Sequence, residues 1–333
     1  MKPQDAMRCA TYKRYGPPEV LQVSDARQPH VRQEGDVRVN VHAAALNPKD
    51  VLVRKGKMRM YYGDVLPRAA SKRVMRIPGH DFAGVVDESR SSRFRVGDRV
   101  FGMVNSWSAG TCAEYVCVGE HELALAPDLS MNELAALPLV SLTALQALRD
   151  QAHLKPGEHV VINGASGGLG TVAIQIARAL GGEVSAVCSK ANEAFVRELG
   201  AHHVLPYDEE ELVRRDASFD VVCDFFGTAP YAKAKALLRR GGRYVTAIPS
   251  FSAVGQELLS RAKLSRAHLV VVRSKSEDLV TLAEWAQSGT LRPVIDSCFD
   301  LDEQPNAHRR IESRRARGKV VVGVRSYIER VTS

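Results

Sequence analysis

The sequence lacks closely spaced cysteines and long apolar runs. Its six cysteines are scattered along 333 residues, and none form the close pairs that a zinc knot or a dithiol redox motif requires. No apolar run approaches the length of a membrane-spanning helix, and the first 15 residues lack the apolar core of a signal peptide. We therefore expect a cytoplasmic protein with reduced thiols.

The composition also lacks the bias of a disordered or fibrous chain. Hydrophobic residues make up 45% and charged residues 25%, ordinary values that leave room for two domains with their own cores. The net charge is +8, and cationic side chains concentrate in residues 54–76 and 309–319. A polyanionic partner is one interpretation, but most such clusters are solvated surface, and no nucleic-acid-binding module accompanies them. The sequence does not favour nucleic-acid binding as the main function.

Residues 155–190 predict a βαβ unit. A short β-branched run at His159–Asn163 is typical of a buried strand, and it leads into a turn rich in glycine. Apolar residues then recur at helical spacing up to Leu180, where two glycines end the helix, and Glu183–Cys188 predicts a second strand.

The glycine turn of this unit predicts a dinucleotide site, because its backbone N–H groups can approach a pyrophosphate at the positive end of a helix. The second strand ends in Ser189 and Lys190, with no acid before Glu193. A carboxylate at this end would accept the ribose hydroxyl of NAD and repel a 2′-phosphate, so its absence favours NADP(H). Ser189 fits equally the N-cap of the next helix. The predicted cofactor-binding residues here are Gly164, Ser166, Gly167, Gly168, Leu169, Gly170, Ser189 and Lys190.

Two other motifs share this part of the chain. Residues 164–168 also fit the nucleophile elbow of α/β-hydrolases, with Ser166 as nucleophile, but the candidate acids Asp220 and Asp224 and the later histidines follow no pattern. Tyr231 and Lys235 form the Tyr-x-x-x-Lys pair of short-chain dehydrogenases. That family opens with its glycine turn and places its tyrosine much further downstream, so we expect Tyr231→Phe to have little effect.

Further strands and helices follow the βαβ unit. Residues 202–205 predict a third strand, residues 219–225 a fourth strand and residues 231–239 a helix. A Gly241-Gly242 turn is then expected before a fifth strand at residues 243–248, and a sixth strand is expected at residues 269–272. In an open parallel sheet of this kind, ligands bind outside the carboxyl ends of the strands.

The first third of the chain predicts short strands at residues 10–15, 21–23 and 36–43, the last with alternating valines. It contains Asn-Pro-x-Asp at 47–50, Pro-Gly-His-Asp-x-x-Gly at 78–84 and Val-Gly-Asp-Arg-Val at 96–100. Together with the later glycine turn, these motifs resemble the medium-chain dehydrogenase/reductase superfamily, and within it the zinc-free quinone oxidoreductase (ζ-crystallin-like) and enone reductase branch. The likeness reaches a Gly-Lys-Val strand near residue 319.

The resemblance implies an α/β protein with a Rossmann doubly wound parallel sheet domain and a β-rich GroES-like catalytic domain. We expect the first part of the catalytic domain at residues 1–127 and the NADP-binding domain at 128–267. Residues 268–333 are expected to form a sheet-edge strand and then return to the catalytic domain. The resemblance further implies an active site in the cleft between the domains, and a homodimer that pairs through the sheet edge.

The resemblance also allows a test for zinc. The family's zinc enzymes hold the metal through a cysteine, a Gly-His-Glu histidine and acid, and a later cysteine. Here Asn47 stands in the first position, His80 and Asp81 remain, and residues 137–141 offer no cysteine. Because a zinc site requires at least three protein ligands, we predict a metal-free enzyme in which His80 and Asp81 are structural.

The function implied is NADPH-dependent reduction of quinones or of the C=C bond of α,β-unsaturated carbonyls, with a small hydrophobic enone, alkenal or quinone as substrate. Such hydride transfer needs donors that hold the developing oxyanion. Asn47 is the candidate donor, and Tyr61 and Tyr62 are candidates for substrate contact or proton delivery, with packing as the alternative. Relatives imply cofactor contacts at Thr143 and Tyr207. The alternative function is a catalytically weak NADPH-binding protein with an RNA-binding or structural role.

Overall fold

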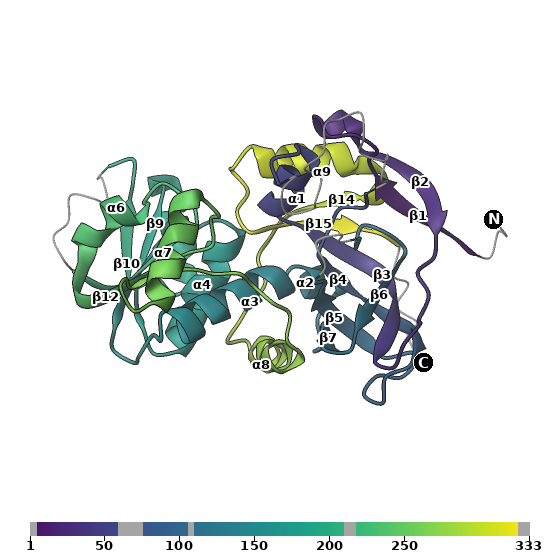
Figure 1. Cartoon of the computed structure of the whole chain (residues 1–333), viewed down its shortest axis with the longest axis horizontal. Coiled ribbons are helices and arrows are strands. Elements are labelled where there is room, and N and C mark those ends of the chain that lie inside the picture. The colour runs from purple at the N-terminus through teal and green to yellow at the C-terminus, as the bar shows by residue number, and fades with distance from the viewer. Residues whose placement is uncertain (1–4, 59–75, 106–109, 210–217, 326–333) are drawn as a thin grey trace. The chain divides into compact units, whose positions relative to one another are not determined.

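The structure is a computed structural model that describes residues 5–58, 76–105, 110–209 and 218–325. The chain divides into two compact units, labelled by element in Figure 1. Unit 1 comprises residues 1–139, 274–287 and 295–333, and unit 2 comprises residues 140–273 and 288–294. No helix in the described part of the chain is long and apolar enough to cross a bilayer.

Unit 1 is built on a seven-stranded sheet with the order β14-β15-β3-β4-β5-β7, in which β6 also pairs with β3, and on a separate hairpin of β1 and β2. Its strands are β1 (Ala6–Thr11), β2 (Gln22–Arg27), β3 (Asp36–Leu46), β4 (Asp81–Ser89), β5 (Arg99–Met103), β6 (Tyr115–Gly119), β7 (Leu123–Leu125), β14 (Ile295–Asp300) and β15 (Lys319–Gly323). Its helices are η2 (Pro18–Val20), α1 (Pro48–Arg54), α2 (Met131–Ala135), α8 (Ser276–Gln287), η8 (Leu301–Glu303) and α9 (Gln304–Glu312).

Strand β3 is the centre of this unit, because β15, β4 and β6 all pair with it. Val37, Val39 and Val41 are fully buried and alternate with half-buried polar residues, as the two-residue period of a strand requires. Gly84 of β4 allows the close approach of the two strands, since a Cβ there would overlap the carbonyl oxygen of Asn40.

Unit 2 is a six-stranded parallel sheet with the order β10-β9-β8-β11-β12-β13. Its strands are β8 (His159–Asn163), β9 (Glu183–Cys188), β10 (His203–Pro206), β11 (Phe219–Asp224), β12 (Leu238–Thr246) and β13 (Ala267–Leu269). Its helical segments are α3 (Pro138–Leu145), which belongs to this unit from Val140 onward, η4 (Gln146–Gln151), α4 (Gly168–Ala179), η5 (Lys190–Asn192), α5 (Glu193–Glu198), α6 (Tyr231–Ala234), η7 (Lys235–Leu237) and α7 (Phe251–Arg261).

Numbered within unit 2, the strands run 3-2-1-4-5-6, the order of a doubly wound dinucleotide fold. The order reverses between β8 and β11, so the carboxyl ends of these two strands mark the switch point where such a sheet binds ligands. The predicted α/β class, with one β-rich part and one parallel-sheet part, is confirmed.

The predicted bounds of three elements of unit 2 are wrong. The helix expected at residues 231–239 ends at Leu237, because β12 begins at Leu238. The turn expected at Gly241-Gly242 lies inside β12, which begins at Leu238 and shifts register against β11. Gly241 has a φ of +86°, so the strand passes through this irregularity with a glycine in the left-handed region. The sixth strand forms at Ala267–Leu269, earlier than predicted, because pairing with Tyr244–Thr246 of β12 selects its position.

Candidate functional site

The glycine turn follows the carboxyl end of β8 and opens α4. Gly164 has a φ of +84°, a conformation that L side chains rarely adopt, and Gly167 is the N-cap residue of the helix. A Cβ at Gly170 would overlap the carbonyl oxygen of Gly164 and lie 2.6 Å from the Cα of Ala165, so the helix packs directly on the turn. The first N–H groups of α4 have no intrahelical acceptor by geometry, and this end therefore suits a pyrophosphate.

Asp224, at the carboxyl end of β11, organises the other side of the switch point. Its buried carboxylate accepts hydrogen bonds from Asn163 Nδ2 at 2.8 Å and from the backbone N–H groups of Gly227 at 2.8 Å and Ala229 at 3.1 Å. These bonds engage Asp224, one of the two candidate acids for a hydrolase triad, and they fix the loop after β11. Sequence analysis did not identify this structural role.

Asn192 links the glycine turn to the end of β9. Its Nδ2 donates to Ser166 Oγ at 3.2 Å and to Ser189 Oγ at 3.0 Å, so these two predicted residues lie together. Ser189 occupies the N-cap position of η5 but makes no capping bond with its side chain. Its hydroxyl serves this bridge instead. Sequence analysis missed Asn192, because the link depends on the packing of two loops.

Lys190 lies at the carboxyl end of β9 among three carboxylates, and with Ser166, Ser189 and Asn192 it forms the rim of the cofactor turn. Its Nζ is 3.0 Å from Glu193 Oε2 and 3.4 Å from Glu209 Oε2, and its backbone N–H donates to Asp208 at 2.9 Å. The hydrogen bond to Glu193, followed by that to Glu209, raises the pKa of Lys190. The exposed Tyr207 follows β10 beside these acids. Asp208 and Glu209 follow β10, so the sequence around the end of β9 does not indicate them.

The other predicted residues lie elsewhere. Thr143 lies in α3 of unit 2 and is 4% exposed. Tyr61 and Tyr62 lie outside the described residues. Tyr231, the tyrosine of the short-chain alternative, packs its ring 5.6 Å from the ring of Tyr244 at the unit 2 core.

Asn47 of unit 1 belongs to a buried triangle with Asp81 and Lys319. Its Nδ2 donates to Asp81 Oδ2 at 2.9 Å, its Oδ1 accepts from Lys319 Nζ at 2.5 Å, and Lys319 Nζ lies 3.0 Å from Asp81 Oδ2. Strand pairing brings the three together, since Ala45 of β3 is opposite Asp81 of β4 and Leu46 is opposite Val320 of β15.

The triangle places a full ion pair in the protein interior. The side chains of Lys319 and Asp81 are 4% and 0% exposed. Their desolvation is offset only when each polar atom has a partner, and here Leu46 O and the N–H of Leu139 supply further bonds. Because the ammonium faces Oδ1 of Asn47 and the carboxylate faces Nδ2, the orientation of the amide is fixed, and one Nδ2 hydrogen remains beyond the bond to Asp81.

Asp50 and His80 form a second buried pair beside the triangle. His80 Nδ1 lies 3.1 Å from Asp50 Oδ1, and the carboxylate also accepts from the N–H groups of Asn47 at 2.8 Å and Gly79 at 3.1 Å. Burial by itself would raise the pKa of Asp50, but the charge and hydrogen bond of His80 and the backbone N–H of Asn47 hold it well below its usual range. His308 is fully buried, and desolvation lowers its pKa to about 4.

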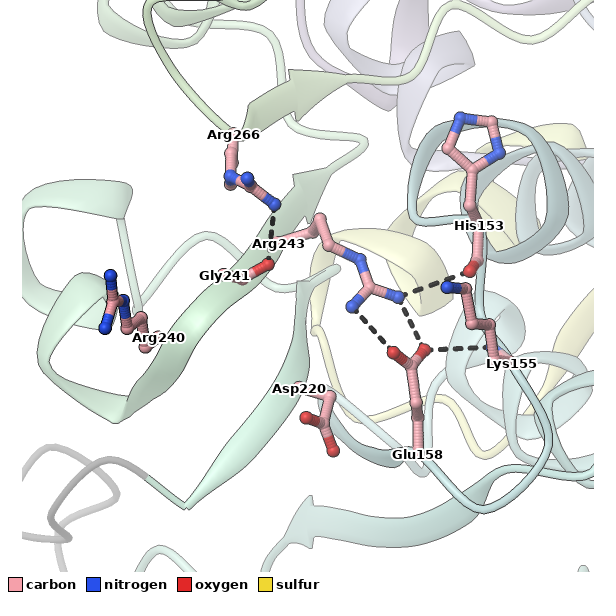
Figure 2. Close-up of a pocket in the computed structure, with 8 residues that line it drawn as sticks. All are labelled: His153, Lys155, Glu158, Asp220, Arg240, Gly241, Arg243 and Arg266. Atoms are coloured by element: carbon pink, nitrogen blue, oxygen red, sulfur yellow. Dashed lines mark hydrogen bonds and ion pairs between the residues drawn. The ribbon is translucent and has the colours of Figure 1, made fainter.

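A pocket of about 350 Å³ opens in unit 2 near the amino end of β8, at the end of the strands opposite the glycine turn (Figure 2). Arg243, one of the cationic residues that line it, is already paired with Glu158 at 2.9 and 2.5 Å and donates to the carbonyl oxygen of Ala152. None of the predicted site residues line it. The lining residues are His153, Lys155, Glu158, Asp220, Arg240, Gly241, Arg243 and Arg266.

Two family models match the chain. The alcohol dehydrogenase GroES-like domain matches residues 33–128, and the zinc-binding dehydrogenase model matches residues 199–322. The first match falls within the β-rich unit 1, whose predicted GroES-like character is thereby confirmed.

Similar proteins cover nearly the whole chain. A mitochondrial NAD(P)H oxidoreductase of Mus musculus is 32% identical over 347 residues, which cover 93% of this chain and 87% of the relative. The 2-methylene-furan-3-one reductase of Solanum lycopersicum is 32% identical over 330 residues, with 95% and 79% covered. The solved structure of the quinone oxidoreductase from Coxiella burnetii superposes with a TM-score of 0.85 at 32% identity and covers 96% of this chain and 100% of its own.

Proposed function

The chain belongs to the medium-chain dehydrogenase/reductase superfamily, in its quinone oxidoreductase branch, and is therefore an oxidoreductase of a nicotinamide-dependent family. From this premise we propose that it uses NADPH to reduce quinones or the C=C bond of α,β-unsaturated carbonyls, and that it does so without zinc. The observation that carries the proposal is the buried triangle of Asn47, Asp81 and Lys319.

The donors around this triangle do not fit a zinc ion. The Lys319 ammonium lies 3.0 Å from the Asp81 carboxylate, so a divalent cation at that carboxylate would face a positive charge at close range. His80 directs Nδ1 to Asp50 and so keeps Nε2 as one potential ligand, but Asn47 presents an amide in place of a thiolate. A zinc ion at the place it occupies in the family's zinc enzymes needs three protein ligands that are free to bind it. The zinc-free proposal rests on this donor set.

NADPH is proposed as the cofactor because the end of β9 presents Ser189 and Lys190 and no carboxylate of its own. A 2′-phosphate accepts hydrogen bonds from hydroxyls and cations, and the rim supplies Ser166, Ser189, Asn192 and Lys190. Glu193 and Glu209 already pair with Lys190, so they should limit the preference over NADH.

In this proposal the turn at Gly164–Gly170 binds the pyrophosphate and orients the cofactor, which when bound supplies a hydride to the electrophilic carbon of the substrate. Asn47 is 2% exposed. Its contribution is the remaining Nδ2 hydrogen, which would donate to the substrate oxygen as negative charge develops there. Asp81 and Lys319 act as positioning residues, because they keep that N–H from rotating away.

The experiment that tests the proposal is NADPH oxidation, with NADH in parallel, against an enone, an alkenal and a quinone before and after chelator treatment. Turnover with NADPH that survives chelation is expected, and the preferred acceptor identifies the substrate class. Loss of turnover on chelation, in a chain that circular dichroism and NADPH binding show to be still folded, would overturn the zinc-free mechanism. Tight NADPH binding without turnover, together with salt-sensitive RNA binding, would favour the non-catalytic alternative.

We further propose that the protein is a homodimer that pairs at the β13 edge of the unit 2 sheet. β13 is the last strand of that sheet, and α7, which contacts β13, has no buried residues. Phe251 and Leu258 of this helix are 95% and 63% exposed, a surface that a second copy would cover. Light scattering coupled to gel filtration should give a dimer for the wild type and a monomer for Leu258→Asp.

A further inference from the structure

Three side chains that can bind metal lie at the amino edge of the unit 2 sheet, away from the cofactor turn. His159, Glu183 and His203 are the first residues of β8, β9 and β10. In the parallel register His159 is opposite Glu183, and His203 is opposite Ser185. Since alternate residues of a strand share a face, Glu183 and Ser185 place both histidines on one face of the sheet.

The ligand atoms of these side chains converge. Within the described residues they form the one group of three histidine, cysteine or acidic side chains whose ligand atoms, one from each residue, all lie within 4.8 Å of one another. His203 Nε2 lies 2.7 Å from Glu183 Oε1, and the rings of His159 and His203 are 5.7 Å apart. Three adjacent strands therefore hold the three donors on a paired backbone.

The surroundings restrain one imidazole and leave the other two ligands exposed to solvent. His159 Nε2 contacts the buried Ser185 Oγ at 2.8 Å, and the ring packs edge-on against Phe219 at 4.7 Å. A hydrogen-bonded partner of this kind orients imidazoles in metal sites. The side chains of Glu183 and His203 are 47% and 53% exposed, so solvent reaches the site and water can supply further ligands.

We propose that His159, Glu183 and His203 form a binding site for a divalent transition-metal ion of the zinc class, outside the cofactor site. Two imidazole nitrogens and one carboxylate oxygen are ligands that Zn²⁺ accepts, and water completes the tetrahedron. In such a site the ligand atoms lie about 3.3 Å apart, so the ion would replace the hydrogen bond between His203 and Glu183 after small rotations of two exposed side chains. The bound ion would tie β8, β9 and β10 together.

The acid nearest to the three ligands already has partners of its own. The nearby Asp220 is engaged by the backbone N–H of His159 and by Arg239, each at 2.9 Å, and is not counted as a ligand.

The test is calorimetric titration of the full chain with Zn²⁺ alone, after chelator treatment and without cofactor. We expect one saturable Zn²⁺ per chain, with affinity lowered at least about tenfold in His203→Gln and in Glu183→Gln. His121→Gln, which removes an exposed histidine of unit 1, is the matched control and should bind as the wild type does. Saturating Zn²⁺ should raise the Tm of the wild type and leave that of His203→Gln unchanged.

Two outcomes would overturn the site: no saturable binding by the wild type, or binding that His203→Gln and Glu183→Gln leave unaltered. The second would assign the ion to other ligands, such as the exposed Cys298. Unchanged NADPH affinity in both variants would show that unit 2 is folded. Because the readout is metal binding and not turnover, the result is independent of the proposed reductase activity.

Discussion

The two units each contain a lysine paired with a carboxylate at 3.0 Å, in opposite surroundings. In unit 1 the side chains of Lys319 and Asp81 are 4% and 0% exposed, whereas in unit 2 those of Lys190 and Glu193 are 56% and 27% exposed. Equal distance does not mean equal energy, because water screens the exposed pair and a buried charge depends on its partner. The buried pair should therefore hold the fold and orient Asn47, while the exposed pair remains adjustable and can tune ligand preference.

The largest effect is expected from breaking the buried pair. Lys319→Met leaves the Asp81 carboxylate buried and without its counter-charge, so the free energy of unfolding of unit 1 should fall by about 3–5 kcal/mol. Urea unfolding followed by tryptophan fluorescence measures this loss, since both tryptophans of the sequence, Trp107 and Trp285, fall within the residue ranges of unit 1. The matched variant Lys190→Met should unfold as the wild type does.

A second substitution separates charge from packing at this position. In Lys319→Met/Asp81→Asn no buried charge remains, so part of the lost stability should return. If Lys319→Met were no more destabilising than Lys190→Met, the contrast between the two pairs would be wrong. Lys319→Met and Lys319→Met/Asp81→Asn should lower kcat by a larger factor than they change KM for the substrate, because Lys319 acts by holding the Asn47 amide.

The next largest effect is expected at the backbone of the glycine turn in unit 2, where the exposed charges contribute little. Gly170→Ala places a Cβ against the carbonyl oxygen of Gly164, so the turn must shift and NADPH affinity should fall by about a hundredfold. Gly255→Ala is the control, since this glycine of α7 has open space around its Cβ position and alanine favours helix. Fluorescence titration measures the NADPH affinity of both variants. Equal affinities would show that the backbone of the turn does not take part in binding.

Lowering the pH should destabilise unit 1 through the buried His308. The folded pKa of about 4 lies below the ordinary value of 6.5, so the unfolded chain takes up this proton first as the pH falls. The stability that depends on the neutral ring is complete above pH 6.5 and is lost between pH 6.5 and 4, which amounts to about 2 kcal/mol from pH 7 to pH 5. Urea unfolding at both pH values should show a smaller loss for His308→Leu. A wild-type loss in that variant would contradict the assignment.

The fold and the cofactor turn could be predicted because their signals are local. The β-branched strand at residues 159–163, the glycines that follow and the helical spacing up to Leu180 lie within one short stretch. A parallel pair of strands needs a crossover helix, so repeated units of this kind predict a parallel sheet, although they do not by themselves specify its strand order. The local signal is misleading at β12, where Gly241 and Gly242 predicted a turn but strand pairing continues the strand through both glycines.

The buried network of unit 1 could be predicted only in part, because it depends on strand pairing between distant segments. The family motif identified Asn47 and the pair His80 and Asp81. Lys319 reaches Asn47 across 272 positions of sequence, and nothing local to either residue indicates that β15 pairs with β3. For the same reason Asn192, Asp208 and Glu209 escaped prediction, since loops from different strand ends bring them to the rim.

The smallest effect concerns the choice of cofactor at the exposed pair. Lys190 should attract a 2′-phosphate, but Glu193 and Glu209 compete for its ammonium at 3.0 and 3.4 Å. We expect Lys190→Ala to lower the preference for NADPH over NADH severalfold, and Glu193→Gln/Glu209→Gln to raise it severalfold, as ratios of kcat/KM. Because water and salt screen these charges, both shifts should shrink at high ionic strength, whereas the loss in Lys319→Met should persist. Opposite shifts from the lysine and glutamate variants would show that the rim sets cofactor preference by charge, and an unchanged ratio in both would move that role to the hydroxyls of Ser166 and Ser189.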